Sequence, residues 1–305
     1  MRWTALICMA LLTTLTARAQ PGPALTPAQS AYHPEAETLF ESGLSDRFSR
    51  RNIQTDLVRD PDPDNARGLA LKGQGAAIIG LTVTGRKYGV SLDNTGEVLI
   101  KNFVFRRRQS KDIYGSGLIL GQSAPTRGET WLSNAWIDLE GKGPIPDYKL
   151  ANNEAVTVEA KSGRLNIRKA VLLGGEESGL DNKGSVRIDA SFIASGHRSI
   201  RVWAGGRVVI ANSIILAYPG FTGLWFGGGK GEANFEYYNC RFGAVGDSEA
   251  DLVSDPPGWM LQTDDDDAVA IRLKRLDKDP FDRSRTSFWV SANAPVPRGY
   301  LETSR

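Results

Sequence analysis

Several side chains in the middle of this sequence have the types that acid–base chemistry on a sugar chain requires. The segment at residues 195–203, SGHRSIRVW, places a histidine beside two arginines. Neighbouring cations lower the pKa of a histidine towards that of a usable base, and arginine neutralises carboxylates through paired hydrogen bonds. A carboxylate, a phenol and an amine complete the set, and the candidate catalytic residues are His197, Arg198, Arg201, Asp181, Tyr148 and Lys149.

These residues fit β-elimination on a uronic-acid polymer. That reaction needs a cation to neutralise the carboxylate, a base for the C5 proton and an acid for the leaving oxygen. Arg201 or Arg198 would be the cation, His197 or Lys149 the base, and Tyr148 the acid. We favour this polysaccharide lyase reaction, with an acidic extracellular polysaccharide as the partner.

Two alternatives stay open. Glycoside hydrolysis needs two carboxylates, for which Asp181 with Glu177 or Glu154 is the candidate pair. The other alternative is a non-catalytic glycan-binding or structural protein, because cross-strand ion pairs and single aromatics are ordinary features of an exposed sheet.

Aromatic and charged residues around the same segment are typical of a surface that binds a polysaccharide. Aromatic rings cover the apolar faces of sugar rings, and cations neutralise uronate carboxylates. The candidate substrate-binding residues are Trp203, Trp225, Tyr218, Glu154, Glu177, Arg107, Lys111 and Tyr114. The last three belong, with Tyr148 and Lys149, to long loops that we expect to form the walls of a groove.

A repeat must position these residues, because they lie far apart in the sequence. Residues 179–245 contain three copies of a unit of three short alternating runs, the pattern of β-strands. Such a unit cannot bury its apolar face alone and must stack on its neighbours. The last residue of the middle run aligns at Gly80, Asn102, Asn134, Lys169, Ala190, Asn212 and Asn239. Asn tolerates a left-handed bend there and can hydrogen-bond to the Asn one repeat away.

This arrangement resembles the right-handed parallel β-helix of the pectate-lyase-like superfamily. The resemblance covers residues 68–246. It implies an all-β, single-domain solenoid of about seven coils, with an N-terminal helical cap and a C-terminal cap. Lys169 and Ala190 depart from the Asn pattern, and we expect them to interrupt the ladder of hydrogen-bonded asparagines. The superfamily includes lyases, hydrolases and non-catalytic proteins, so the resemblance leaves the chemistry open.

Metal dependence is not expected. The chain lacks the acidic calcium cluster of pectate lyases, so a lyase of this kind would work without calcium. The segment Thr263–Asp267 (TDDDD) could ligate calcium but has no alternating oxygen spacing, so a solvated acidic turn is the better interpretation.

Within each repeat, alternation places one set of side chains outside the predicted coil. The first outward column is Ser91, Ile119, Thr157, Asp181, Arg201 and Trp225, and the second includes Glu159, Lys183 and Trp203. Neighbours in a column are about 4.8 Å apart in parallel strands. Asp181 should therefore contact Arg201, and Lys183 should lie between Glu159 and Trp203.

The two ends of the chain do not show the repeat pattern. Residues 1–19 are typical of a secretory signal peptide cleaved near Ala19, which predicts a secreted or periplasmic bacterial protein. Residues 20–67 are expected to form a linker and an N-terminal cap, with a helix at residues 35–53, and residues 247–305 a C-terminal cap. The formal net charge of +2 gives no reason to expect nucleic acid as a partner, and no segment is long enough to span a membrane.

Overall fold

The computed structural model describes residues 58–59, 67–73, 76–84, 87–94, 96–107, 114–139, 152–175, 177–264, 269–284, 288–289, 293–297 and 300–302. The predicted signal peptide and the predicted helix at residues 35–53 lie outside these described residues.

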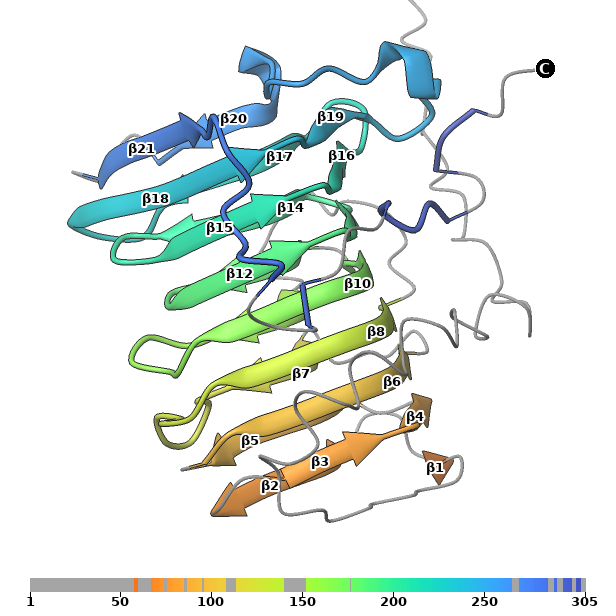
Figure 1. Cartoon of the computed structure of the whole chain (residues 1–305), viewed down its shortest axis with the longest axis vertical. Helices are drawn as coiled ribbons and strands as arrows, with labels where there is room; N and C mark the ends of the chain where they lie inside the picture. The colour runs from red at the N-terminus through yellow and green to blue at the C-terminus, as the bar shows by residue number, and fades with distance from the viewer. Residues whose placement is uncertain are drawn as a thin grey trace, which may run out of the picture.

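Apart from two short 3-10 helices, η3 (Glu249–Asp251) and η4 (Gly258–Met260), the regular structure of the described chain is β-strand, arranged in two long sheets of parallel strands (Figure 1). The eight-stranded sheet contains, in spatial order, β2 (Arg67–Gly73), β5 (Tyr88–Asn94), β7 (Tyr114–Leu120), β9 (Asn152–Val158), β11 (Ser178–Asn182), β14 (Arg198–Trp203), β17 (Thr222–Gly227) and β20 (Leu261–Thr263).

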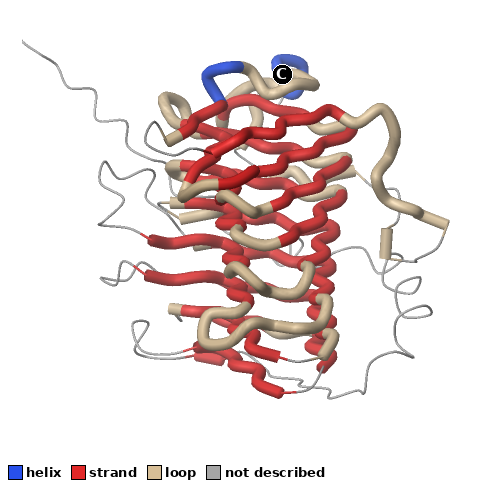
Figure 2. Tube along the Cα trace, turned by 90° about the vertical axis from the view of Figure 1, so that its left-hand side faces the viewer, coloured by secondary structure: helices blue, strands red, loops and turns tan. Residues whose placement is uncertain are grey.

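The thirteen-stranded sheet takes the remaining strands: β1 (Val58–Arg59), β3 (Ala76–Ile79), β4 (Thr82–Thr84), β6 (Val98–Arg106), β8 (Thr130–Asp138), β10 (Leu165–Leu173), β12 (Ser185–Asp189), β13 (Phe192–Ser195), β15 (Arg207–Ala211), β16 (Ile214–Ala217), β18 (Gly231–Tyr238), β19 (Arg241–Ala244) and β21 (Val269–Arg275). Strands that pair within a sheet come from successive repeats, so the chain returns to each sheet one layer further along (Figure 2). This topology is compatible with the parallel β-helix that the sequence predicts.

The predicted bend positions coincide with the left-handed residues of the backbone. All seven aligned residues have positive φ: Gly80 (73°), Asn102 (54°), Asn134 (56°), Lys169 (50°), Ala190 (47°), Asn212 (50°) and Asn239 (47°). Nδ2 of Asn134 donates to Oδ1 of Asn102 at 2.7 Å, and Nδ2 of Asn239 donates to Oδ1 of Asn212 at 2.8 Å. The ladder is thus formed where two asparagines stack directly, and it stops at Lys169 and Ala190.

The interior is one continuous apolar core. Inward-facing Val, Ile, Leu and Phe side chains from every layer form a single buried cluster that extends from Ile78 to Met260. Because each layer buries its residues against the layers above and below, the core alone fixes which side chains point outward.

The last third of the described chain extends the stack and then turns back along it. β20 pairs with β17 and β21 with β18, so the parallel pairing continues beyond residue 246, where the sequence pattern placed the end of the coils. Farther on, Phe281, Phe288 and Trp289 pack with Trp131 on the outer side of the thirteen-stranded sheet (blue trace across β15 and β12, Figure 1). These described residues cover a side of the stack.

The same segment is fixed to the sheet by charge. Nη1 of Arg283 lies 2.8 Å from Oδ2 of Asp189, whose side chain is fully buried. Phe281, Arg283 and Trp289 thus pack on the thirteen-stranded sheet, whereas β20, which also belongs to the C-terminal region, pairs with β17 in the eight-stranded sheet. None of the helices in the described part of the chain has the length and apolar composition that a membrane span needs.

Candidate functional site

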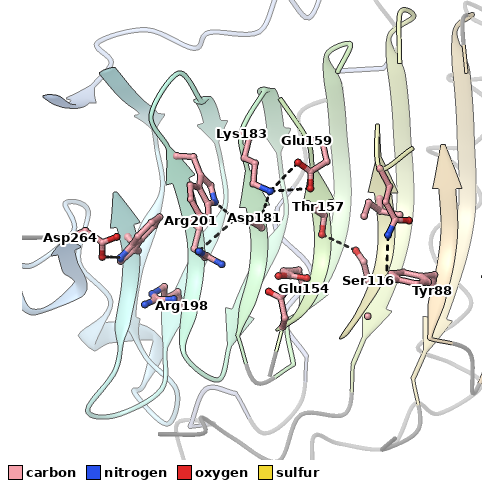
Figure 3. Close-up of a pocket in the computed structure, with 16 residues that line it drawn as sticks. Tyr88, Ser116, Glu154, Thr157, Glu159, Asp181, Lys183, Arg198, Arg201 and Asp264 are labelled. Atoms are coloured by element: carbon pink, nitrogen blue, oxygen red, sulfur yellow. Dashed lines mark hydrogen bonds and ion pairs between the residues drawn. The ribbon is translucent and has the colours of Figure 1, made fainter. Parts of the chain in front are cut away.

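A groove of about 600 Å³ lies on the outer face of the eight-stranded sheet (Figure 3). Its lining residues lie in or just after six of the strands, β5 to β17, and Asp264 directly follows β20. Its lining residues are Tyr88, Gly115, Ser116, Ile119, Gln122, Asn152, Glu154, Thr157, Glu159, Asp181, Lys183, Arg198, Arg201, Trp203, Trp225 and Asp264. Three of them are basic and four are acidic, so the groove combines both charges.

The strand register confirms the predicted columns. Asp181 pairs with Thr157 on one side and with Arg201 on the other, and Arg201 pairs in turn with Trp225. Nε of Arg201 lies 3.6 Å from Oδ1 of Asp181. Nζ of Lys183 lies 3.0 Å from Oε2 of Glu159. Residues from different repeats are therefore side by side, as the ladder alignment required.

Strands β5 to β17 of the eight-stranded sheet each have a small inward-facing residue, such as Gly179 in β11, and residues just before it add a second set of side chains to the groove. Gly179 faces the core, where a Cβ would lie 2.8 Å from Cγ2 of Ile193, and the next residue, Leu180, is buried as well. Two consecutive inward residues break the strict alternation that the sequence predicts. The residues that come just before this inward position in these strands therefore face outward. They include Glu154 of β9 and Arg198 of β14, which line the groove.

Two arginines share one buried carboxylate at the groove floor. Nη1 of Arg201 donates to Oε1 of Glu177 at 2.6 Å, and Nη1 of Arg198 donates to the same oxygen at 3.2 Å. The side chain of Glu177 is 1% exposed. Its burial raises the pKa of Glu177, and the two arginines act against that rise.

Asp181 is surrounded by donors and cations. Nε1 of Trp203 donates to Oδ1 of Asp181, and Nζ of Lys183 lies 3.9 Å from Oδ2. Together with Arg201, these contacts give this carboxylate a positively charged surrounding.

The two indoles contact the cations of the protein itself. The guanidinium of Arg201 lies 4.7 Å from the ring centroid of Trp203 and 4.8 Å from that of Trp225, and that of Arg198 lies 5.1 Å from Trp225. Trp225 is only 2% exposed, and its Nε1 donates to Oδ1 of Asp264 at 3.0 Å. Trp225 thus holds the arginines in place, and Trp203, which is half-buried, is the more exposed of the two indoles.

Glu154 has the most perturbed carboxyl group in the groove. Burial raises the pKa of Glu154 well above its ordinary value, and the nearby carboxylates of Asp181 and Glu177 raise it further. When its amide is oriented to donate, the nitrogen of Asn152 lies 2.7 Å from Oε1 of Glu154 and 2.7 Å from Oε2 of Glu177. Glu154 is therefore a carboxylic acid that retains its proton at a higher pH than an exposed glutamate does.

Other candidate residues lie away from the groove. His197 does not line it and makes an edge contact with Phe221, with ring centroids 5.7 Å apart. Burial, and then Arg198 and Arg201, lower the pKa of His197 to about 4. Tyr218 packs against the outer cluster that contains Tyr300, and burial raises the pKa of Tyr218.

The predicted walls are described only in part. Arg107 is buried and hydrogen-bonds to Asn153, and Tyr114 begins β7. Lys111, Tyr148 and Lys149 lie outside the described residues.

Sequence reasoning missed several groove residues. Asn152, which bridges two carboxyl groups, begins a strand and has no periodic signal of its own. Oγ of Ser116 lies 3.1 Å from Oγ1 of Thr157, a hydroxyl pair that only the register brings together. Asp264 was expected in a solvated turn, and it reaches the groove because β20 pairs with β17. In the described part of the chain, no three His, Cys, Asp or Glu residues gather into a group that could hold a metal ion.

Comparison with known proteins gives no relative for this chain. No protein-family model matches it, and neither a curated protein nor a solved structure does.

Proposed function

We propose that this chain binds a polysaccharide along the groove of the eight-stranded sheet and hydrolyses it. The observation that carries the proposal is the environment of Glu154, a buried carboxyl group with a raised pKa, in the same groove as Asp181, a carboxylate among cations. Two carboxyl groups whose surroundings differ in this way are the acid and base that glycoside hydrolysis requires.

In this reaction Glu154 is the general acid and Asp181 the general base or nucleophile. Glu154 transfers its proton to the glycosidic oxygen as the bond from that oxygen to the anomeric carbon breaks. Water supplies the new hydroxyl group at the anomeric carbon, and its proton passes to a carboxylate. Asn152 positions Glu154, and Arg201 and Lys183 contact the carboxylate of Asp181 and hold it in the groove.

β-Elimination on an acidic polysaccharide is the second candidate. Its support is the pair of arginines, Arg198 and Arg201, which line the groove and present guanidinium groups that suit a uronate carboxylate. The base and the acid would come from Lys149 and Tyr148. We rank this reaction second because the hydrolytic roles are filled by described groove residues, and because His197 does not line the groove.

Non-catalytic binding is the remaining alternative. It has the same groove and the same glycan, but neither Glu154 nor Asp181 would be needed for a reaction.

Our proposal also includes the handedness of the fold, its number of coils and its superfamily. We infer a right-handed β-helix of about seven coils, similar to the pectate-lyase-like superfamily, in a secreted or periplasmic protein. The positive-φ ladder and the all-parallel pairing support the solenoid. The calcium-independent chemistry of the groove rests on Glu154 and Asp181.

Product analysis tests the proposal. The purified chain is incubated with neutral and acidic polysaccharides, and new reducing ends and the absorbance of unsaturated uronates near 235 nm are both followed. Hydrolysis predicts reducing ends without that absorbance. Glu154→Gln and Asp181→Asn should each lower the rate about 10²–10⁴-fold, while Glu232→Gln, an exposed carboxylate of β18, leaves it unchanged. Absorbance that survives Glu154→Gln would favour the lyase, and binding without products would favour the non-catalytic alternative.

A further inference from the structure

A second hollow, of about 210 Å³, lies on the other sheet. It is lined by Arg164, Ser185, Arg187, Arg207, Val209, Glu236 and Pro280. Three of these residues are arginines and one is acidic. The hollow is on the outer face of the thirteen-stranded sheet, and no residue of the glycan groove takes part in it.

Strand register builds this arginine hollow. Ser185 pairs with Arg207 of the next layer, and Arg164 immediately precedes Leu165, which pairs with Val186. The arginines thus stand on either side of Ser185, each about 4.8 Å away along the stack. Because serine is short, the position between the two guanidinium groups is left open and carries a hydroxyl group.

Arg187 forms the floor and is held rigidly. Its guanidinium lies 5.0 Å from the ring centroid of Phe281 and 5.4 Å from that of Trp289, and its Nη2 donates to the carbonyl oxygen of Pro280 at 3.2 Å. Among the described residues it has no carboxylate partner within ion-pair distance. Burial lowers the pKa of Arg187, Arg164 and Arg207 lower it further, and Glu129 acts against them.

The flanking arginines have donors to spare. Arg164 uses Nη1 for Oε1 of Glu129 at 3.1 Å, and Arg207 uses Nη2 for Oε2 of Glu236 at 2.9 Å. These ion pairs restrain the two side chains, and the remaining guanidinium N–H groups of each arginine can donate to another acceptor. A tetrahedral oxyanion presents several acceptor oxygens at once and suits three converging guanidinium groups and a hydroxyl donor.

We propose that the arginine hollow is an oxyanion site that takes a sulfate or phosphate group. The group would lie over Ser185 between Arg164 and Arg207, with Arg187 beneath it. The same chemistry is offered by the free inorganic ion and by a sulfate or phosphate ester on a sugar.

Titration calorimetry on the full chain tests the site. Sodium sulfate and sodium phosphate are titrated against sodium chloride at matched ionic strength, followed by glucose 6-sulfate, glucose 6-phosphate and unmodified glucose. The site predicts saturable one-to-one binding of the tetrahedral anions and none of chloride or glucose. Binding of the inorganic ions alone identifies the free ion as the ligand, and tighter binding of the esters identifies the modified sugar.

Variants assign the binding to these residues. Arg207→Gln and Ser185→Glu should each weaken it about tenfold or more, because a charge-assisted hydrogen bond is lost or an acidic group fills the position. Arg272→Gln, an exposed arginine of β21, is the matched control and should leave the affinity unchanged. Circular dichroism checks that each variant is folded. Equal affinity in wild type and both hollow variants, or no saturable binding of any oxyanion, would overturn the proposal.

Discussion

The guanidinium of Arg201 and the carboxylate of Glu177 form a buried ion pair, 2.6 Å between Nη1 and Oε1, in the floor of the groove. Neither side chain is more than 8% exposed. Arg198 contacts the same oxygen, so one carboxylate from the segment before β11 is shared by two arginines of β14.

Glu177→Gln is therefore expected to destabilise the fold strongly. It leaves two largely buried cations without their shared partner, which costs about 3–5 kcal/mol in the free energy of unfolding. Glu232→Gln removes a carboxylate from a pair that is half-exposed on both sides, and it should cost less than about 1 kcal/mol. Urea unfolding of both variants measures the difference. Equal losses in the two variants would show that the buried network does not stabilise the groove.

Glu154 predicts a decrease in stability with rising pH. Its pKa is higher in the folded chain than the ordinary 4.5 of an unfolded one, so the folded state binds the extra proton between these two values. Stability is then lost as the pH rises through that window. Glu154→Gln cannot ionise and should flatten the dependence, although Glu177 contributes a smaller slope of the same sign. Urea unfolding from pH 4.5 to 8 checks this, and an unchanged slope would contradict the assignment of Glu154 as a protonated acid.

Lys169 offers a stabilising substitution. Oδ1 of Asn134 is buried and has no hydrogen-bond partner among the described residues, and Lys169 occupies the same bend one layer on, at φ 50°. In the ladder each Nδ2 donates to Oδ1 of the preceding layer, so Lys169→Asn should supply the missing donor. We expect a gain of about 0.5–1.5 kcal/mol, measured by thermal unfolding. Lys169→Gln keeps an amide but is too long for the ladder, and it should give no comparable gain.

His197 is expected to be neutral over the whole physiological range. Its pKa of about 4 lies below the ordinary 6.5, so the unfolded chain binds more protons between these values and stability rises with pH across that window. The chain has two histidines, and His33→Gln leaves the His197 signal alone for NMR titration. A midpoint near 6.5 would refute the burial and charge effects described for this side chain.

The sequence predicts the parts of the structure that periodicity controls. The seven bend residues and the column through Asp181 and Arg201 follow from aligning the strands, because parallel layers in register place equivalent residues side by side. The order of strands was therefore predictable without any side-chain detail.

Features that depend on contacts between non-repeating segments were not predictable. The inward row that includes Ala155 and Gly179 changes which residues face outward, and Glu154, which precedes Ala155, lines the groove for that reason. The packing of Phe281 and Trp289 on the thirteen-stranded sheet involves a segment with no repeat pattern. The sequence offers Glu177 or Glu154 as the partner carboxylate of Asp181, and periodicity does not indicate that burial raises the pKa of Glu154 well above its ordinary value.

The leaving-group dependence of Glu154→Gln tests the proposed chemistry most directly. A general acid is needed when the leaving oxygen is a poor leaving group, and much less when it belongs to an acidic phenol. Once a cleaved polysaccharide is identified, wild type and variant are compared on that glycan and on an aryl glycoside of its repeating sugar. We predict that Glu154→Gln loses glycan cleavage about 10²–10⁴-fold and retains most cleavage of the aryl glycoside. Equal losses on both substrates, or no loss on either, would contradict the role of Glu154 as proton donor.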